Sequence, residues 1–579
     1  MSYLQFLSNL TFIDISIIVS YLLVSIFVGL YFRNKGKDDI DSYFVSQRNL
    51  PWWLLGTSMV ATTLSIDTPI VIISWIRDPG IWKNWFWWSF LFTHCLVIFF
   101  FSRYWRRAEV ITDNQIIEMR YSGKPAEYLR LFKASYFSLF FNLIISAWII
   151  SAFLKIFNVV LGYDSTIFLI ITTSVALLYT ASSGLKGIVV NDFIQYFIAF
   201  AGSFILVFFL INSDEIGGIS NYFSLVNSLP AEKLKMIPSI YNHDDFMIFI
   251  SYAVVVWWSS HNADGGGYII QRLCSAKTEK DGVFGSIWFV LNHYVLRFAP
   301  WIIIGLCALI LYPTESSQLV DNEEIYPLLI KDYVGVGFKG FLIVTLLAAY
   351  MSTISTQINW GSSYLVNDLY KRFICKDETE LHYVFVSKIF TVLFLIAALF
   401  LGLRIKNIGS AWIFLWSVSS GLGFFLIARW FWWRINSWSE ISALISSIVL
   451  SLIFYLLDFY GTIEISFIFK LLIIPISIAI GLLATFFTSP EDPSTLKYFY
   501  EKIRPDGFWK FSNAQTNNDS FFSPILSSLM LASSILILIY AVIQLATGNL
   551  FGFTVASCLG GIILFYIVKG IKRFFIFTP

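Results

Sequence analysis

The chain has 579 residues, of which 57% are hydrophobic, 19% aromatic and only 13% charged, and its formal net charge is +2. This composition is too apolar for a soluble globular protein of this length. Apolar runs of membrane-spanning length recur from end to end, which predicts an all-α polytopic membrane protein. The net charge is near neutral and most charged residues lie in loops between the apolar runs, which gives no indication of nucleic-acid binding. The five cysteines lie singly, so the sequence predicts neither a disulfide framework nor a zinc site.

Fifteen apolar spans follow one another along the chain. They are predicted at 13–32, 51–76, 84–102, 134–160, 165–182, 188–211, 246–270, 282–312, 338–366, 384–403, 408–432, 438–458, 466–488, 523–545 and 550–571. With the N-terminus placed outside, the cytoplasmic loops carry about three times as many Lys and Arg residues as the outer loops, as the positive-inside rule requires. The sequence therefore predicts a multi-pass protein of the plasma (cytoplasmic) membrane, with its N-terminus outside and its C-terminus in the cytoplasm.

Two of these spans are interrupted. Span 51–76 carries a cluster of hydroxyl side chains followed by Asp67 and Pro69, and span 246–270 carries three consecutive glycines. Irregular backbone at membrane depth is tolerated only where protein or a water-filled cavity satisfies it. Either span alone fits a proline kink or a glycine packing contact. Two such spans, each followed by four more, favour a transporter built from two inverted five-helix repeats, with its substrate site between them.

This pattern divides the chain into six predicted segments. They are an N-terminal helix and cytoplasmic loop (1–50), a first five-helix repeat (51–211), a second, inverted five-helix repeat (246–432), two further helices (433–488), a cytoplasmic loop (489–522) and an accessory C-terminal helix pair (523–579). The expected fold is an inverted five-plus-five transporter core with about fifteen transmembrane helices in total.

The stretch AAYMSTISTQINWGSS, at 348–363, has too many side-chain oxygens for a simple membrane helix. With Thr345, its polar residues share one helical face, at 345, 352, 355, 356, 359 and 363. Hydroxyls in membrane helices often bond to their own backbone or join neighbouring helices. They also provide hard oxygen ligands for sodium, together with the free carbonyls of a broken helix. The stripe has no titratable residue, which disfavours proton coupling.

Five stretches resemble the sodium:solute symporter family, which includes bacterial sodium/proline and sodium/galactose symporters. In chain order they are SYFVSQRNLPWWLLGTSMVATTLSID, GLKGIVVNDFIQ, YIIQRLCSAKTEKDG, AAYMSTIST and NDLYKRF. The resemblance covers roughly residues 10–490. It implies ten core helices in two inverted repeats and sodium-coupled symport of a small organic solute into the cell by alternating access.

The resemblance also implies two sets of sodium ligands. For the main site these are the backbone carbonyls of Ala61, Leu64 and Ala349 and the hydroxyls of Ser352 and Thr353. For a second site they are Asp192, Ser352, Ser355 and Thr356. The alternative for Asp192 is a helix N-cap beside a cytoplasmic loop.

A substrate cavity is predicted between the two interrupted spans. Its expected lining residues are Thr63, Asp67, Thr68, Trp257, His261, Asn262, Asp264 and Tyr268. Each of them could instead be a contact between helices, and packing is the stronger interpretation for the aromatic ones.

The chain departs from both arms of the family it resembles. Proline-type members have an Asp where Thr63 stands, and sugar-type members have Asn and Gln where Gly266 and Gly267 stand. YIIQR resembles the sugar arm, whereas MSTIS resembles the proline arm. A sugar or related polar solute is slightly favoured, and an amino acid or organic acid is the alternative.

The expected partners are the solute, co-transported sodium and the lipid bilayer, without an organic cofactor. A solute sensor on the same fold is a rival, although the loop 489–522 is too short for an output domain. A membrane enzyme is disfavoured, because the histidines and cysteines are scattered along the sequence. The sequence gives no indication of the oligomeric state.

Overall fold

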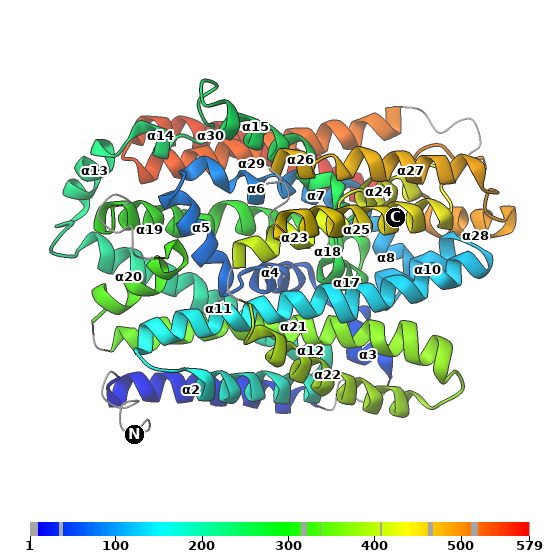
Figure 1. Cartoon of the computed structure of the whole chain (residues 1–579), viewed down its shortest axis with the longest axis horizontal. Coiled ribbons are helices and arrows are strands. Elements are labelled where there is room, and N and C mark those ends of the chain that lie inside the picture. Colours follow the sequence, from blue (N-terminus) through cyan, green and yellow to red (C-terminus); the bar gives the residue numbers. More distant parts are fainter. Residues whose placement is uncertain are drawn as a thin grey trace.

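The computed structural model describes residues 10–33, 39–313, 321–335, 337–405, 408–460, 467–510 and 519–577. These residues form helices that run largely side by side along the long axis of the molecule (Figure 1). The described part contains no β-strand, only the isolated bridges Leu50–Ala276 and Trp432–Phe508. The predicted all-α class is therefore confirmed.

The first predicted repeat begins with a broken helix. Its helices are α4 (Trp52–Thr63), α5 (Asp67–Arg77), α6 (Trp85–Trp88), α7 (Phe90–Leu96), α8 (Ser102–Ala108), α9 (Ile116–Arg120), α10 (Gly123–Ser135), α11 (Leu143–Leu161) and α12 (Thr166–Ile211). The axes of α4 and α5 differ by 60°. Pro69 lies in the first turn of α5. A backbone N–H has no intrahelical partner there, so the proline is compatible with the start of α5 and the chain breaks before it.

The second predicted repeat is broken in a different way. Its helices are α15 (His243–Ser251), α16 (Trp257–Ser259), α17 (Gly267–Cys274), α18 (Glu279–Leu291), α19 (Phe298–Leu311), α20 (Ile325–Tyr333), α21 (Phe338–Ser363), α22 (Glu380–Gly402), α23 (Ile408–Ser419) and α24 (Leu422–Phe431). Between α16 and α17, Gly265 and Gly266 have φ angles of +126° and +74°. Glycine adopts this left-handed region without a steric penalty, so these residues form the unwound segment.

The remaining helices flank the two repeats. They are α2 (Phe12–Tyr31), α3 (Ile40–Val45), α13 (Ile219–Ser228), α14 (Ala231–Leu234), α25 (Ser437–Phe459), α26 (Phe467–Lys470), α27 (Ile473–Phe487), α28 (Pro493–Ile503), α29 (Asp519–Ala546) and α30 (Leu550–Phe577). Helices α29 and α30 pack on each other, and α29 also lies against α7 and α19. The predicted C-terminal helix pair thus packs on the outside of both repeats.

The structure contains ten helices long and apolar enough to cross a membrane, and two bent pairs that bring the number to twelve, within the described residues. The difference of three from the fifteen predicted spans has the following origins. Spans 165–182 and 188–211 form the single helix α12, which bends at Gly184. Span 246–270 is broken into short helices, and span 466–488 contains only the shorter apolar helix α27.

The loop predicted at 489–522 contains helix α28, which was not predicted from the sequence. Its Phe499 ring and the Trp509 ring lie 5.6 and 5.1 Å from the guanidinium of Arg120. Cation–π contacts of this kind stabilise a buried arginine. This segment is therefore docked against α9, with residues 511–518 outside the described part.

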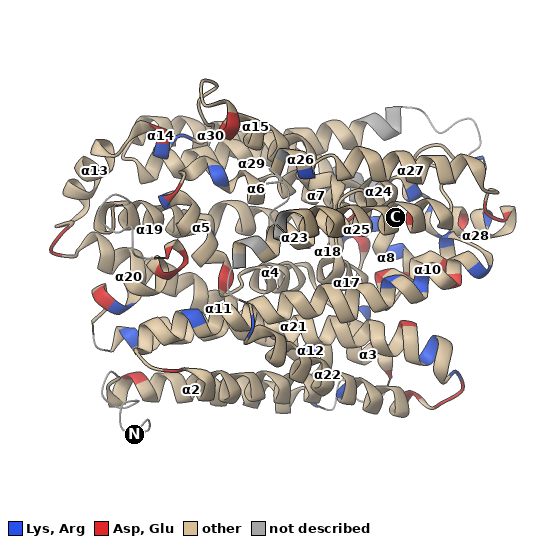
Figure 2. Cartoon of the chain, viewed as in Figure 1, with Lys and Arg blue, Asp and Glu red and all other residues tan. Residues whose placement is uncertain are grey.

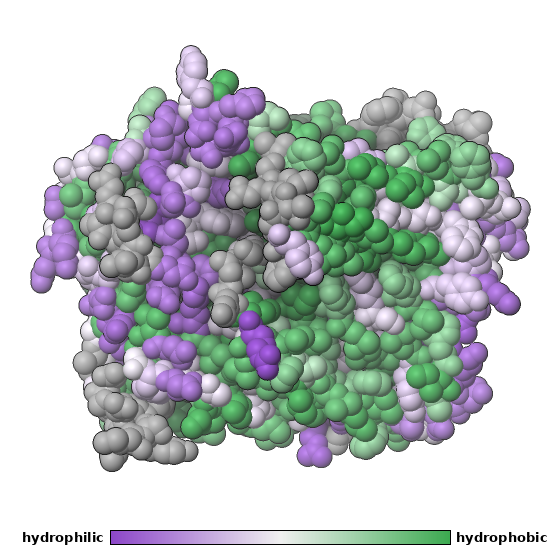
Figure 3. Space-filling view, in the orientation of Figure 1, coloured by the Kyte–Doolittle hydropathy of each residue, from purple (hydrophilic) through white to green (hydrophobic). Residues whose placement is uncertain are grey.

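Charged residues gather at the two ends of the molecule and are sparse between them (Figure 2). The zone between the ends presents apolar side chains over α27 and around α22 (Figure 3). Ion pairs join segments that the distribution of Lys and Arg assigns to the same side of the membrane. These pairs are Arg107–Glu279 (2.8 Å) and Arg372–Glu118 (3.1 Å) on one side, and Lys155–Glu323 (2.7 Å) and Lys233–Asp78 (3.0 Å) on the other.

Helices α4 and α18 approach closely at two glycines. A Cβ atom on Gly56 would lie 2.4 Å from the carbonyl oxygen of Gly285, which is backbone and cannot rotate away. We expect Gly56→Val to lower the free energy of unfolding by about 1–3 kcal/mol or more, because an overpacked core must shift. Thermal unfolding of the purified protein in detergent measures this. Gly561→Val on α30 is the control, since a Cβ there meets nothing within 4 Å; equal losses in both variants would contradict the prediction.

Candidate functional site

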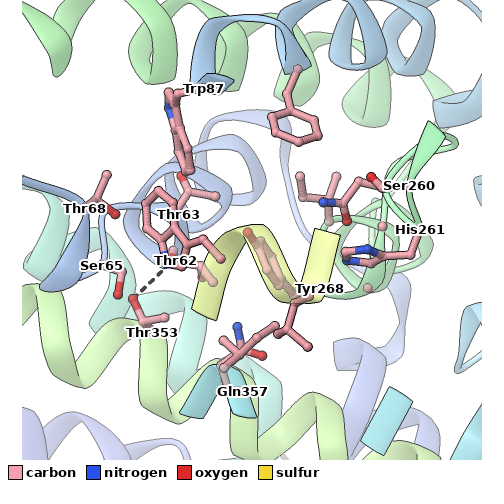
Figure 4. Close-up of a pocket in the computed structure, with 18 of the residues that line it drawn as sticks. Thr62, Thr63, Ser65, Thr68, Trp87, Ser260, His261, Tyr268, Thr353 and Gln357 are labelled. Carbon is pink, nitrogen blue, oxygen red and sulfur yellow. Dashed lines mark hydrogen bonds between the residues drawn. The ribbon is translucent and has the colours of Figure 1, made fainter. Parts of the chain in front are cut away.

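A cavity of about 200 Å³ lies where the break between α4 and α5 faces the break between α16 and α17 (Figure 4). Its walls carry many aromatic side chains. The tryptophans and histidines that line it are Trp87, Trp148, Trp360, Trp412, Trp416, His94, His261 and His293. Both broken helices and both predicted repeats therefore contribute to one site.

Six of the eight predicted cavity residues line this space. They are Thr63, Asp67, Thr68, His261, Asn262 and Tyr268. Trp257 does not line it, and its ring packs 5.6 Å from that of Phe92. Asp264 lies on the far side of the unwound segment, where its carboxylate accepts hydrogen bonds from Arg429 (2.6 Å) and from the indole N–H of Trp430 (3.0 Å). The sequence placed both residues in the break, but it could not show which way each side chain points.

Several buried polar atoms around the cavity have no hydrogen-bond partner among the described residues. They are Ser65 Oγ, Asp67 Oδ1, Trp87 Nε1, Ser260 Oγ, Gln357 Oε1 and Trp360 Nε1. Leaving such atoms unpaired costs free energy, so a polar ligand that pairs with them binds favourably. Gln357 and Trp360 were not predicted. Their spacing from Thr353 is the available signal, since residues four and seven positions on share a helical face.

The hydroxyl of Thr353 connects α21 to the broken end of α4. Its Oγ1 donates to the carbonyl oxygen of Thr62 at 2.9 Å, drawn as a dashed line in Figure 4, and to that of Ala349 at 3.1 Å. Ala61 lies in the last turn of α4 and Leu64 is its C-cap residue, so carbonyls of this turn are not all used by the helix. Thr353, one of the five predicted ligands of the main sodium site, thus lies against the broken end of α4.

The carboxylate of Asp192 is the centre of a buried polar cluster. Its Oδ1 accepts from Ser352 Oγ at 2.6 Å and its Oδ2 from Ser58 Oγ at 2.5 Å. The guanidinium of Arg272, on α17, lies 3.5 Å from Oδ2 and donates to Thr356 Oγ1 at 2.7 Å. Ser355 points elsewhere, because its Oγ donates to the backbone carbonyl of Ser352 at 3.0 Å.

This cluster changes the expectations for Asp192. It lies inside α12, eight positions beyond the bend at Gly184, so the alternative of a helix N-cap is wrong. Asp192, Ser352 and Thr356 are brought together as predicted for the second site. Arg272 was missed, although it stands in the YIIQR stretch. In this conformation its positive charge lies among the oxygens that a second sodium would need, and two cations at such distances repel each other.

Arg297 lies just behind the cavity wall. Its Nη1 donates to Thr63 Oγ1 at 3.0 Å, and its guanidinium carbon lies 5.7 and 5.1 Å from the ring centres of Trp87 and Trp301. Its Nε and Nη2 have no hydrogen-bond partner among the described residues. Aromatic faces therefore cover this charge, and it forms no ion pair among the described residues.

Comparison with known proteins supports the resemblance read from the sequence. A family model described as the sodium:solute symporter family matches residues 43–449, which is most of the chain. The chain belongs to the sodium:solute symporter family. This symporter is similar to a sodium/glucose cotransporter of Vibrio parahaemolyticus, with 24% identity over 77% of this chain and 85% of that protein. It is also similar to a sodium/sialic acid symporter of Proteus mirabilis, with 25% identity over 63% of this chain and 73% of that one.

The fold of the symporter also matches a solved structure. That structure is a substrate-bound, outward-open state of a sodium-coupled sialic acid symporter, with a TM-score of 0.65, 21% identity, and coverage of 83% of this chain and 99% of the other. It confirms the inverted-repeat transporter fold. The symporter is a membrane transporter that co-transports sodium with a small solute, and it is not an enzyme.

Proposed function

We propose that this symporter couples the entry of sodium to the uptake of a small polar organic solute by alternating access. The observation that carries the proposal is the contact between Thr353 and the broken end of α4, beside a cavity lined by both breaks. Sodium bound by Ala61, Leu64, Ala349, Ser352 and Thr353 would hold α4 and α21 together. Because binding is reciprocal, sodium that tightens the solute is itself tightened by the solute.

A sugar or related polar solute fits the cavity better than an apolar one. Unpaired donors such as Trp87 Nε1 and unpaired acceptors such as Gln357 Oε1 both border the space. A polyhydroxylated molecule offers both kinds of group, and aromatic rings can cover its apolar faces. The relatives named for glucose and sialic acid support this choice. An amino acid or an organic acid is the alternative.

We also propose a second sodium site, which requires that Arg272 first move away. Its ligands would be Asp192, Ser352, Ser355 and Thr356. Arg272 donates to Thr356 and lies against Asp192, so it must withdraw before sodium can share these oxygens. A movement of α17 during transport would meet this condition. We propose that the first sodium binds before this movement and a second only after it.

Alternating access requires the cavity to open toward the cytoplasm. A buried ion-pair network lies beneath it, in which Arg429 contacts Asp264 (2.6 Å) and Glu440 (3.5 Å) and Lys133 contacts Glu440 (3.1 Å). The network joins the unwound segment of the second repeat to α24, α25 and α10. With the N-terminus outside and the C-terminus in the cytoplasm of a plasma (cytoplasmic) membrane, it closes the inner route.

The sodium gradient is sufficient for uphill uptake. One charge that crosses about 100 mV contributes ~2.3 kcal/mol. A gradient of about tenfold in sodium adds ~1.4 kcal/mol, and the two together sustain a solute accumulation of roughly a few hundredfold. Two sodium ions per cycle would approximately square this ratio.

Uptake into proteoliposomes tests the proposed function. We expect an inward sodium gradient to drive accumulation of one class among sugars, amino acids and organic acids, and a sodium ionophore to abolish it. A pH gradient without sodium is the control. Accumulation that follows the pH gradient and ignores sodium would contradict sodium coupling, and sodium-dependent binding without accumulation would identify a sensor.

A further inference from the structure

The cavity wall carries one carboxylate, that of Asp67, which forms no ion pair among the described residues. Asp67 is the first residue of α5 and is only 2% exposed. Its Oδ2 accepts a hydrogen bond from the indole N–H of Trp412 at 3.2 Å, whereas its Oδ1 has no hydrogen-bond partner in the described part of the chain. Asp67 is the only acidic residue among the described residues that line the cavity, and no lysine or arginine lines it. An ionised carboxylate buried without a cationic partner is strongly unfavourable.

Aromatic rings surround Trp412, whose indole N–H donates the hydrogen bond to Asp67. The Trp412 ring stacks on Trp87 at 5.6 Å and meets Trp148 and Trp75 at 6.2 and 6.1 Å. The electron-rich faces of such rings attract a dehydrated cation. Trp87 itself is stacked on both Trp412 and His293, so Trp148 and Trp412 are the rings that can face a bound cation. Together with the carboxylate oxygen of Asp67 they are complementary to a protonated amine.

Arg297, which lies behind the cavity wall, is not the cationic partner of Asp67. Arg297 donates to Thr63 Oγ1 at 3.0 Å and to the carbonyl oxygen of Val60 at 3.4 Å, and it forms no ion pair with Asp67 among the described residues. Its guanidinium stacks over Trp87 and Trp301 instead. Asp67 Oδ1 thus remains open to a hydrogen bond from a molecule inside the cavity.

We propose that the transported solute carries a protonated amine, which binds Asp67 Oδ1 beside the rings of Trp148 and Trp412. This inference rests on the proposed function and defines the solute of the same cavity more closely. The remaining unpaired atoms, such as Ser260 Oγ and Gln357 Oε1, would hold polar groups elsewhere on the solute. An amine-bearing polyol or amino sugar combines both features.

Matched probe pairs test the amine directly. The pairs are glucosamine with glucose, and ethanolamine with ethylene glycol. Binding in saturating sodium is followed by the quenching of tryptophan fluorescence, since five tryptophans line the cavity. We expect at least one cationic member to bind about tenfold or more tightly than its neutral partner, the size expected for hydrogen bonds to charged groups.

Variants separate the role of Asp67 from general effects. Asp67→Asn keeps the shape but removes the charge, and it should abolish the preference for the cationic member. Asp67→Glu should retain part of it, and Asp78→Asn, at the exposed end of α5, should leave it unchanged. Equal binding within every pair, no binding of any cationic member, or a preference that survives in Asp67→Asn would each overturn the inference.

The same samples distinguish this inference from the proposed function. Sodium-driven uptake of a neutral solute, unchanged in Asp67→Asn, would overturn the amine assignment and leave sodium symport intact. A higher sodium requirement for every probe in Asp67→Asn would assign the carboxylate to sodium and would also overturn the inference. Uptake indifferent to sodium in the unmodified protein would overturn the proposed function itself.

Discussion

Replacing Thr353 with alanine should raise the sodium concentration that half-saturates transport by about tenfold to a hundredfold. The hydroxyl is a hard oxygen ligand, and in the structure it also joins α21 to the carbonyl of Thr62 at 2.9 Å. A hydrogen-bonding or ion-binding contact to a charged group contributes ~1.5–3 kcal/mol, which corresponds to that change in affinity. Sodium titration of uptake, or of tryptophan fluorescence at fixed solute, measures it.

Two variants on the same helix control for general damage. Thr353→Ser keeps the oxygen and should retain most of the sodium affinity. Ser363→Ala removes a hydroxyl that donates only to its own helix, to the carbonyl of Trp360 at 2.7 Å, and should leave sodium affinity unchanged. An unaltered sodium requirement in a well-folded Thr353→Ala protein would show that the ligand assignment is incorrect.

The breaks in the helices could be predicted because their causes are local. Pro69 and the three glycines act on their own backbone, and the structure places unwound segments beside them. The family and the inverted-repeat fold were likewise accessible, since apolar runs, charge alternation and motif order lie along the chain. The same local information failed at α28, a short amphipathic helix in a polar stretch that resembles a loop.

The side-chain partners could not be predicted, because they depend on packing between distant segments. Asp264 stands in the break and looked like a cavity residue, but Arg429 from α24 pairs with it. Trp87 and Trp412 lie in ordinary apolar spans, where tryptophan usually packs against lipid or other helices. Only the folded chain brings their rings to the same wall as Asp67.

Removing the carboxylate of Asp192 should lower the free energy of unfolding by about 3–5 kcal/mol, because it leaves a buried charge without its partner. The side chains of Asp192 and Arg272 are both fully buried, and their charged groups lie 3.5 Å apart. Thermal unfolding of Asp192→Ala in detergent measures this loss. Asp78→Ala is the control, since the Asp78 side chain is 55% exposed in its ion pair with Lys233 at 3.0 Å, and exposed pairs contribute about 0–1 kcal/mol.

The double variant tells whether the loss comes from the unpaired arginine. Asp192→Ala combined with Arg272→Met should recover much of the stability, and the interaction free energy from the four proteins isolates the pair. Arg272→Met alone removes the positive charge from the oxygens of Asp192, Ser352 and Thr356. Sodium that binds this freed cluster should stabilise the variant more steeply with concentration than it stabilises the unmodified protein. If the sodium dependence is the same in both, Arg272 is not what limits a second ion at this position.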